Sequence, residues 1–163
     1  MVVSEKVLKW AIRIYPPLFF QRIWVVKFEK GFRGVHVKIN KSFLNKNFNN
    51  AIFGGTIFSA TDPFYPLLFH QLLSHKGYNI VAWSKSAQIQ YLKPCVTDVR
   101  FNIQIMDDDI EECEHLLNTF GKYMKNFPID IYDKKGETCV SVMNEVYVRN
   151  LDFDFDKIEP VIL

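Results

Sequence analysis

The residues of this chain best suited to chemistry lie in one stretch, Asn45 to Ser74. From Phe53 to Leu73 the only charged side chain is Asp62, in a segment otherwise dominated by apolar residues. Burying an unpaired charge is costly, so a carboxylate there calls for a reason. A carboxylate can act as a base or a nucleophile, and Gly54-Gly55 at a helix start can bring backbone N–H groups close to a carbonyl. The stretch therefore indicates a site that could act on a carbonyl group.

Both features also have a purely structural interpretation. Asp62 followed by Pro63 matches an N-cap followed by proline at the first helical position, in which case Asp62 only restarts a broken helix. Gly54-Gly55 can simply let a helix pack closely on a sheet. His70 lies eight residues after Asp62, on roughly the same helical face, so an Asp–His pair is conceivable. For His70 we favour a structural, hydrogen-bonded role.

The spacing of apolar residues predicts the helices and strands that must position the Asn45–Ser74 stretch. A segment apolar all round predicts a buried helix over approximately 54–74. Alternation of apolar and polar residues predicts strands on either side of it, at 21–29, 33–40, 78–92, 98–106, 127–132 and 137–149. A helical stripe over 107–124 predicts a peripheral helix that begins with an acidic cluster, where negative charge is favourable. The pattern is that of an α+β domain.

A second peripheral helix is predicted over 4–15, with Ser4 as its N-cap. One stripe of this helix is apolar and contains Val7, Leu8, Ala11, Ile14 and Tyr15, whereas Lys6, Lys9 and Arg13 face away. Such a helix either lies on a membrane surface or packs on the domain or its partner subunit. We favour packing.

Composition narrows the class of protein. The 163 residues suffice for one domain with a sizeable core, and we divide them into an N-terminal helix and lead-in (1–20), a main domain (21–150) and a C-terminal tail (151–163). A net charge of +2 with scattered basic residues indicates no nucleic-acid partner. We expect no membrane span and no secretory signal. Three widely spaced cysteines suggest a reducing, cytoplasmic location and no metal site.

The run FGGTIFSATD, Phe53 to Asp62, resembles a signature of hotdog-fold thioesterases. In the phenylacetyl-CoA thioesterase branch, His-Gly-Gly opens the central helix and a catalytic Asp follows nine positions after the His. Here Gly54-Gly55 match the glycines, Asp62 falls nine positions after Phe53, and Phe53 replaces the His. The strand ending Leu92-Lys93-Pro94 is also similar to that branch.

A closer resemblance is to an uncharacterised, thioesterase-like hotdog family with a domain of unknown function. Five features carry it, over about Ile23 to Arg149. They are Asn45 to Asn50, Phe53 to Gly55, Asp62 to Tyr65, Trp83 to Ala87, and Lys93-Pro94. The resemblance implies a hotdog fold, with a long central helix wrapped by a curved antiparallel sheet. It also implies a homodimer or dimer of dimers, with ligand sites at the subunit interface.

The same resemblance implies a cytoplasmic acyl-CoA thioesterase that acts on acyl-CoA or another acyl thioester. Asp62 would be the base or nucleophile, and Gly55 would donate a hydrogen bond to the oxyanion. Five further residues are expected to bind substrate, namely Phe53, Gly54, Phe58, Tyr65 and Lys93. No cofactor or metal is expected apart from the coenzyme A moiety of the substrate.

Two other functions stay open at this point. Because Phe53 replaces the histidine and the helix is very aromatic, the chain could be a non-catalytic module that binds an acyl chain or an acyl carrier. It could also be a purely structural dimer that scaffolds a partner. The first alternative predicts a co-purifying lipid or thioester, and the second predicts no pocket.

Overall fold

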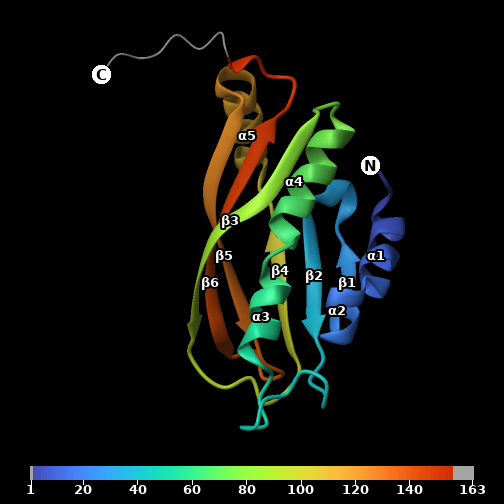
Figure 1. The fold of residues 1–163 in the computed structure, drawn as a ribbon, viewed down its shortest axis with the longest axis vertical. Helices are drawn as coiled ribbons and strands as arrows, with labels where there is room; N and C mark the ends of the chain where they lie inside the picture. Colours follow the sequence, from blue (N-terminus) through green and yellow to red (C-terminus); the bar gives the residue numbers. More distant parts are fainter. Residues whose placement is uncertain (1, 156–163) are drawn as a thin grey trace.

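The structure, a computed structural model, describes residues 2–155 and contains one antiparallel sheet curved around a central helix (Figure 1). The strand order is β1-β2-β4-β5-β6-β3. The strands are β1 (Ile23–Phe28), β2 (Gly34–Ile39), β3 (Ile80–Tyr91), β4 (Val99–Gln104), β5 (Lys122–Tyr132) and β6 (Thr138–Asn150). The predicted α+β class and the antiparallel sheet are confirmed. Most of the predicted tail, from residue 156 onwards, lies outside the described residues.

The central helix is two helices, α3 (Gly54–Thr61) and α4 (Phe64–His75), separated by Asp62 and Pro63. The prediction of one helix over 54–74, buried all round, is therefore wrong in two respects. The prolines of this segment interrupt the helical hydrogen bonds. One face of α3 is also open in the single chain, since Asp62 is exposed and Phe58 is 44% exposed.

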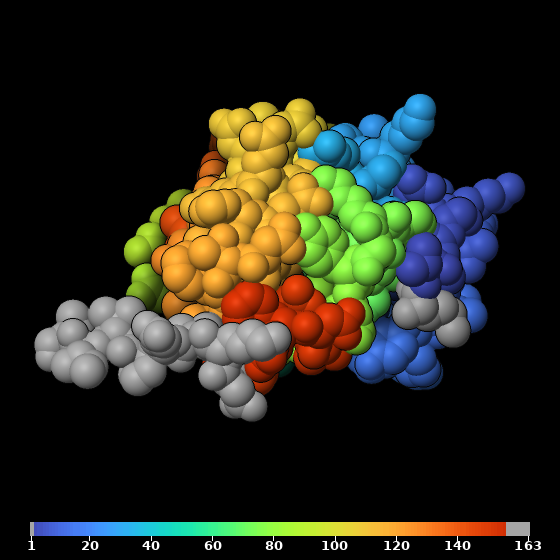
Figure 2. All heavy atoms as spheres, turned by 90° about the horizontal axis from the view of Figure 1, so that it is seen from above, coloured from blue at the N-terminus to red at the C-terminus, as the bar shows by residue number. Residues whose placement is uncertain are grey.

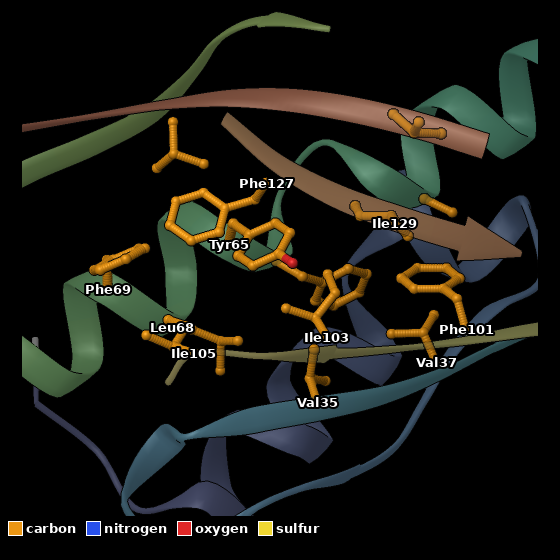
Figure 3. Close-up of a cluster of buried hydrophobic side chains, with 14 of the residues drawn as sticks. Val35, Val37, Tyr65, Leu68, Phe69, Phe101, Ile103, Ile105, Phe127 and Ile129 are labelled. Atoms are coloured by element: carbon orange, nitrogen blue, oxygen red, sulfur yellow. The ribbon is translucent and has the colours of Figure 1, made fainter. Parts of the chain in front are cut away.

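Helix α4 supplies the centre of the core. Its aromatic side chains pack against the inner faces of β4 and β5 (Figure 3). The Tyr65 ring stacks on Phe127 with 4.6 Å between centroids, and Phe69 lies 5.6 Å from the same ring. Such aromatic pairs add to the free energy of burial. Both rings thus join α4 to the inner face of β5, where Phe127 is buried.

Two helices precede the sheet. Helix α1 (Glu5–Ile14) begins after Ser4, whose hydroxyl accepts a hydrogen bond from Val7 N as predicted, and α2 (Pro16–Phe20) follows it. Helix α1 lies beside β1, the strand at one end of the sheet (Figure 1). The Nε of Arg13 donates to the carbonyl of Val25 at 2.8 Å. The helix therefore covers this edge of the sheet and blocks further strand pairing there.

Helix α5 (Asp107–Phe120) is shorter than predicted, and β5 begins correspondingly earlier. Gly121 has a φ of 70°, the left-handed conformation that ends helices at glycine. The acidic cluster at the start of α5 stabilises the helix N-terminus, as the sequence suggested. Asp109 accepts a hydrogen bond from Met106 N at 3.0 Å, and Lys125 bridges Asp109 and Glu112 at 2.8 and 2.7 Å.

Asn45 holds the Asn-rich loop between β2 and α3. Its buried side chain donates to the carbonyls of Gln21 and Asn40 at 2.8 and 3.0 Å and accepts from Ser42 N at 2.8 Å. Its carbonyl accepts from Phe53 N at 2.7 Å. The start of α3 is therefore tied to the end of the α2 segment through one residue.

We expect Asn45→Ala to lower the free energy of unfolding by about 2–3 kcal/mol, because it leaves buried backbone groups of this loop without partners. Urea denaturation measures the change. Asn49→Ala is the matched control, since Asn49 is exposed, and it should change stability by no more than about 0.5 kcal/mol. Equal effects of the two substitutions would contradict this role of Asn45.

Candidate active site at the helix kink

The kink between α3 and α4 leaves backbone carbonyls without helical donors. In an α-helix each carbonyl accepts from the N–H four residues later. Pro63 removes the donor for Ser59, and Pro66 removes the donor for Asp62, because proline has no N–H. The backbone stays helical at Asp62, with φ −64° and ψ −51°. The chain therefore bends at Asp62 without unwinding.

Two side chains from the sheet satisfy carbonyls at this kink. The hydroxyl of Ser84, on β3, donates to the carbonyl of Asp62 at 2.7 Å. The amide of Asn144, on β6, donates to the carbonyl of Thr61 at 3.1 Å, and Asn144 is fully buried. These contacts fix the position of Asp62 relative to the sheet. The sequence analysis missed both residues, although Asn144 breaks an otherwise apolar series of inward positions on β6.

The side chain of Asp62 lies in the wall of a groove of about 1100 Å³. The groove runs between the N-terminal helices and the kink, and reaches β3 at Ala82–Ser84. Its lining is mainly apolar and includes Phe58, one helical turn before Asp62. Among residues 2–155, the carboxylate of Asp62 has no hydrogen-bond or ion-pair partner. An unpaired carboxylate beside an apolar groove can serve as a base or nucleophile.

The second predicted element of the site is the start of α3. Gly54 and Gly55 are its first two residues, so their N–H groups have no acceptor within the helix and lie at the positive end of its dipole. The hydroxyl of Tyr91, on β3, donates to the carbonyl of Gly54 at 3.0 Å. Phe53 is 58% exposed, and its ring lies against Gly55. The helix start can therefore offer donors at the surface, beside an aromatic ring.

The two elements are too far apart within one chain to act on the same carbonyl. Asp62 follows Gly55 by seven residues, which corresponds to about 10 Å along a helix axis. A reacting water and an oxyanion donor must each lie within about 3 Å of the reacting group. One copy of the chain therefore presents the carboxylate and the helix start at two separate places.

Two of the predicted substrate-binding residues, Tyr65 and Lys93, lie away from the groove and the helix start. Tyr65 belongs to the core, where its hydroxyl donates to the carbonyl of Pro128 at 3.0 Å and burial raises the pKa of the phenol. Lys93 pairs with Asp133 at 2.8 Å and with Glu137, and the hydrogen bond to Asp133 contributes most to raising the pKa of Lys93. Its charge is therefore already countered.

His70 lines the groove but does not pair with Asp62. The eight residues between them correspond to about 12 Å along a helix axis. Burial lowers the pKa of the half-buried imidazole, which favours its neutral form.

A family model matches residues 4–148, and it is described as a domain of unknown function, DUF4442. The chain belongs to this family. The match spans α1 through most of β6, so the DUF4442 domain includes both the kink and the N-terminal helices. No curated protein sequence matches the chain.

Solved structures with the same fold include several thioesterases. A protein of unknown function from Pseudomonas aeruginosa, PA5026, named a probable thioesterase, matches with a TM-score of 0.76 at 14% identity, over 92% of this chain and 98% of that one. The thioesterase HI1161 of Haemophilus influenzae matches with a TM-score of 0.68 at 11% identity, over 94% and 95%. PaaI of E. coli, from the phenylacetic acid degradation operon, matches with a TM-score of 0.61 at 14% identity, over 91% and 96%. At these identities the likeness establishes the hotdog fold.

The contact between Ser84 and Asp62 gives a test of the kink. Ser84→Ala should lower the free energy of unfolding by about 1 kcal/mol, because the Asp62 carbonyl loses its donor. In a Pro66→Ala background the helix regains an N–H for that carbonyl, so the same substitution should cost less than half as much. A double-mutant cycle by urea denaturation measures the difference. Equal costs in the two backgrounds would contradict this account of the kink.

Proposed function

We propose that this chain is a thioesterase that hydrolyses acyl-CoA or another acyl thioester, with Asp62 as its base or nucleophile. One observation carries the proposal: an unpaired carboxylate is held at a helix kink in the wall of a mainly apolar groove. An apolar groove suits an acyl chain, and the carboxylate suits the attack on its carbonyl. The names of the hotdog neighbours support this class of substrate.

The chemistry requires two proton transfers and the replacement of a carbon–sulfur bond by a carbon–oxygen bond. As the oxygen of water bonds to the thioester carbonyl carbon, the carboxylate of Asp62 takes a proton from that water. The carbonyl oxygen becomes an oxyanion, which the N–H of Gly55 stabilises at the positive end of α3. The carbon–sulfur bond then breaks, and the leaving thiolate takes up the proton held by Asp62, which restores the carboxylate. The products are a carboxylic acid and a free thiol.

The complete site is shared between two copies of the chain in this proposal. A second copy is needed because Asp62 and Gly55 of one chain lie about 10 Å apart along the helix axis. Strand β3 could join the two copies, since it is the edge strand of the sheet and pairs only with β6 among the described residues. Its 12 residues form a long edge, and such an edge is a ready template for pairing with another strand. A homodimer joined at β3 would bring Asp62 of one chain toward Gly55 of the other.

Of the residues predicted to bind substrate, some belong to this proposed site and others do not. Phe58 would contact the acyl chain, while Phe53 and Gly54 would lie beside the thioester. Tyr65 has no part in the proposed site, since the core encloses it. A phosphate of coenzyme A could reach Lys93 only in competition with Asp133 and Glu137.

A second function is favoured by the position of Phe53. Its ring lies against Gly55, the residue proposed to stabilise the oxyanion. A protein that kept this ring in place would bind an acyl thioester without hydrolysing it. Binding of acyl-CoA without release of thiol would favour this non-catalytic module.

Asp62→Asn should abolish thiol release from acyl-CoA while it changes the free energy of unfolding by no more than about 0.5 kcal/mol, because the side chain is exposed and unpaired. A thiol-release assay across short, long and aromatic acyl-CoAs measures the activity. Asp130→Asn, an exposed change on β5, is the matched control and should retain full activity. Full activity of Asp62→Asn would overturn the assignment of the site.

A further inference from the structure

The N-terminal part of the chain is much more basic than the whole. Residues 1–33 contain seven Lys and Arg and two Glu, a net charge of +5, whereas the whole chain has +2. The other 130 residues therefore have a net charge of −3. The basic residues are scattered along the chain, but they are denser in its first 33 residues. Such asymmetry indicates a surface that meets an anionic partner.

The fold gathers these charges on one side of α1. Lys6, Lys9 and Trp10 line a shallow hollow together with Lys27 and Lys30, from β1 and the turn after it. Within the described chain, Lys6, Lys9 and Lys30 have no ion-pair partner.

The acidic residues near this hollow are already engaged. The carboxylate of Glu5 accepts a hydrogen bond from Gly31 N at 2.8 Å. Glu29 lies 3.8 Å from Lys27 and 2.8 Å from His36. Four lysines and one carboxylate, Glu5, line the hollow, so its net charge is +3.

Large apolar side chains are exposed on α1 and α2, and one of them, Trp10, lines the hollow. Trp10, Ile14 and Phe20 are 56%, 71% and 63% exposed, and α1 has no buried residue. The guanidinium of Arg13 lies 5.0 Å from the centre of the Trp10 ring. Figure 2 shows the N-terminal segment, in blue, on the flank of the molecule, with green α4 between it and orange α5. Basic and apolar groups thus share the exposed side of α1 and its surroundings.

We infer that this basic and apolar surface, formed by α1, α2 and the Lys27–Lys30 segment, docks on an anionic lipid bilayer. A helix with lysines on one face and Trp and Ile on another suits the interface, where apolar groups enter the acyl boundary and lysines meet the headgroups. A tryptophan beside an arginine is a typical pair at that depth. No helix of residues 2–155 is long and apolar enough to cross a bilayer.

Other occupants fit the surface less well. A second copy placed symmetrically on the same surface would bring the two basic clusters together, and like charges would repel. A nucleic acid would neutralise the lysines but offers no apolar environment for Ile14 and Phe20. A bilayer with anionic headgroups satisfies both features. The inference is tested separately from the proposed hydrolysis, because the basic hollow shares no lining residue with the groove and vesicle binding is a different assay from thiol release.

The test is co-sedimentation of the protein with vesicles of phosphatidylcholine alone or mixed in equal parts with phosphatidylglycerol. We expect binding to the mixed vesicles only. The triple variant Lys6→Gln, Lys9→Gln, Lys30→Gln should bind them on the order of 100-fold more weakly, since each lysine near an anionic surface contributes about a factor of five. The control variant Lys46→Gln, Lys122→Gln, Lys135→Gln removes three exposed lysines elsewhere and should bind like the wild type.

A second readout follows insertion of the apolar residues. In a protein with Trp24→Phe and Trp83→Phe, Trp10 is the remaining tryptophan, and its fluorescence should shift to shorter wavelength on the mixed vesicles. Failure of the wild type to bind the mixed vesicles, or equal loss in the two triple variants, would overturn the inference. Double-stranded DNA that binds as tightly and competes through the same lysines would also overturn it. A change of oligomeric mass in the triple variant of Lys6, Lys9 and Lys30 would overturn it too.

Discussion

The constraint on which the rest of the structure depends is the bend imposed on the central helix by Pro63 and Pro66. A helix that a curved sheet wraps needs hydrogen-bond partners for its buried backbone groups, because a buried carbonyl without a donor costs about 1–3 kcal/mol. The prolines remove two internal donors, and Ser84 and Asn144 of the sheet supply hydrogen bonds to the bend. The strands that wrap the helix are thereby also the elements that hold it bent. Asp62 lies at this point, so its backbone is fixed while its carboxylate stays free.

The two ends of the sheet have different roles. At β1, helix α1 lies along the edge, and Arg13 takes up one of its carbonyls. At β3, the edge is long and remains available for another strand. A chain that covers one edge and leaves the other open is suited to form a closed pair rather than a filament. The separation of Asp62 from Gly55 fits such a pair, since each chain would then contribute half of each proposed site.

Much of the fold was predictable because its signals are local. The alternation in Val35, Val37 and Ile39 marks a strand with one buried face, and these three residues are buried as expected. The exposure of Asp62 was not predictable, because it depends on where the curved sheet leaves α3 uncovered. The hydrogen bond from Asn144 to Thr61 joins residues 83 positions apart, and local patterns do not report such contacts. The end of α5 at Gly121 could have been predicted from the sequence, since glycine commonly ends helices.

The most direct test of the shared site is complementation between two inactive variants. One chain would bear Asp62→Asn and the other Gly55→Val, whose side chain would displace the Phe53 ring and crowd the helix start. Purified as a heterodimer through two different tags, the pair should regain about half of the wild-type thiol-release rate, because one of its two sites is then intact. A folded heterodimer without activity would show that the carboxylate and the helix start do not act together across two chains.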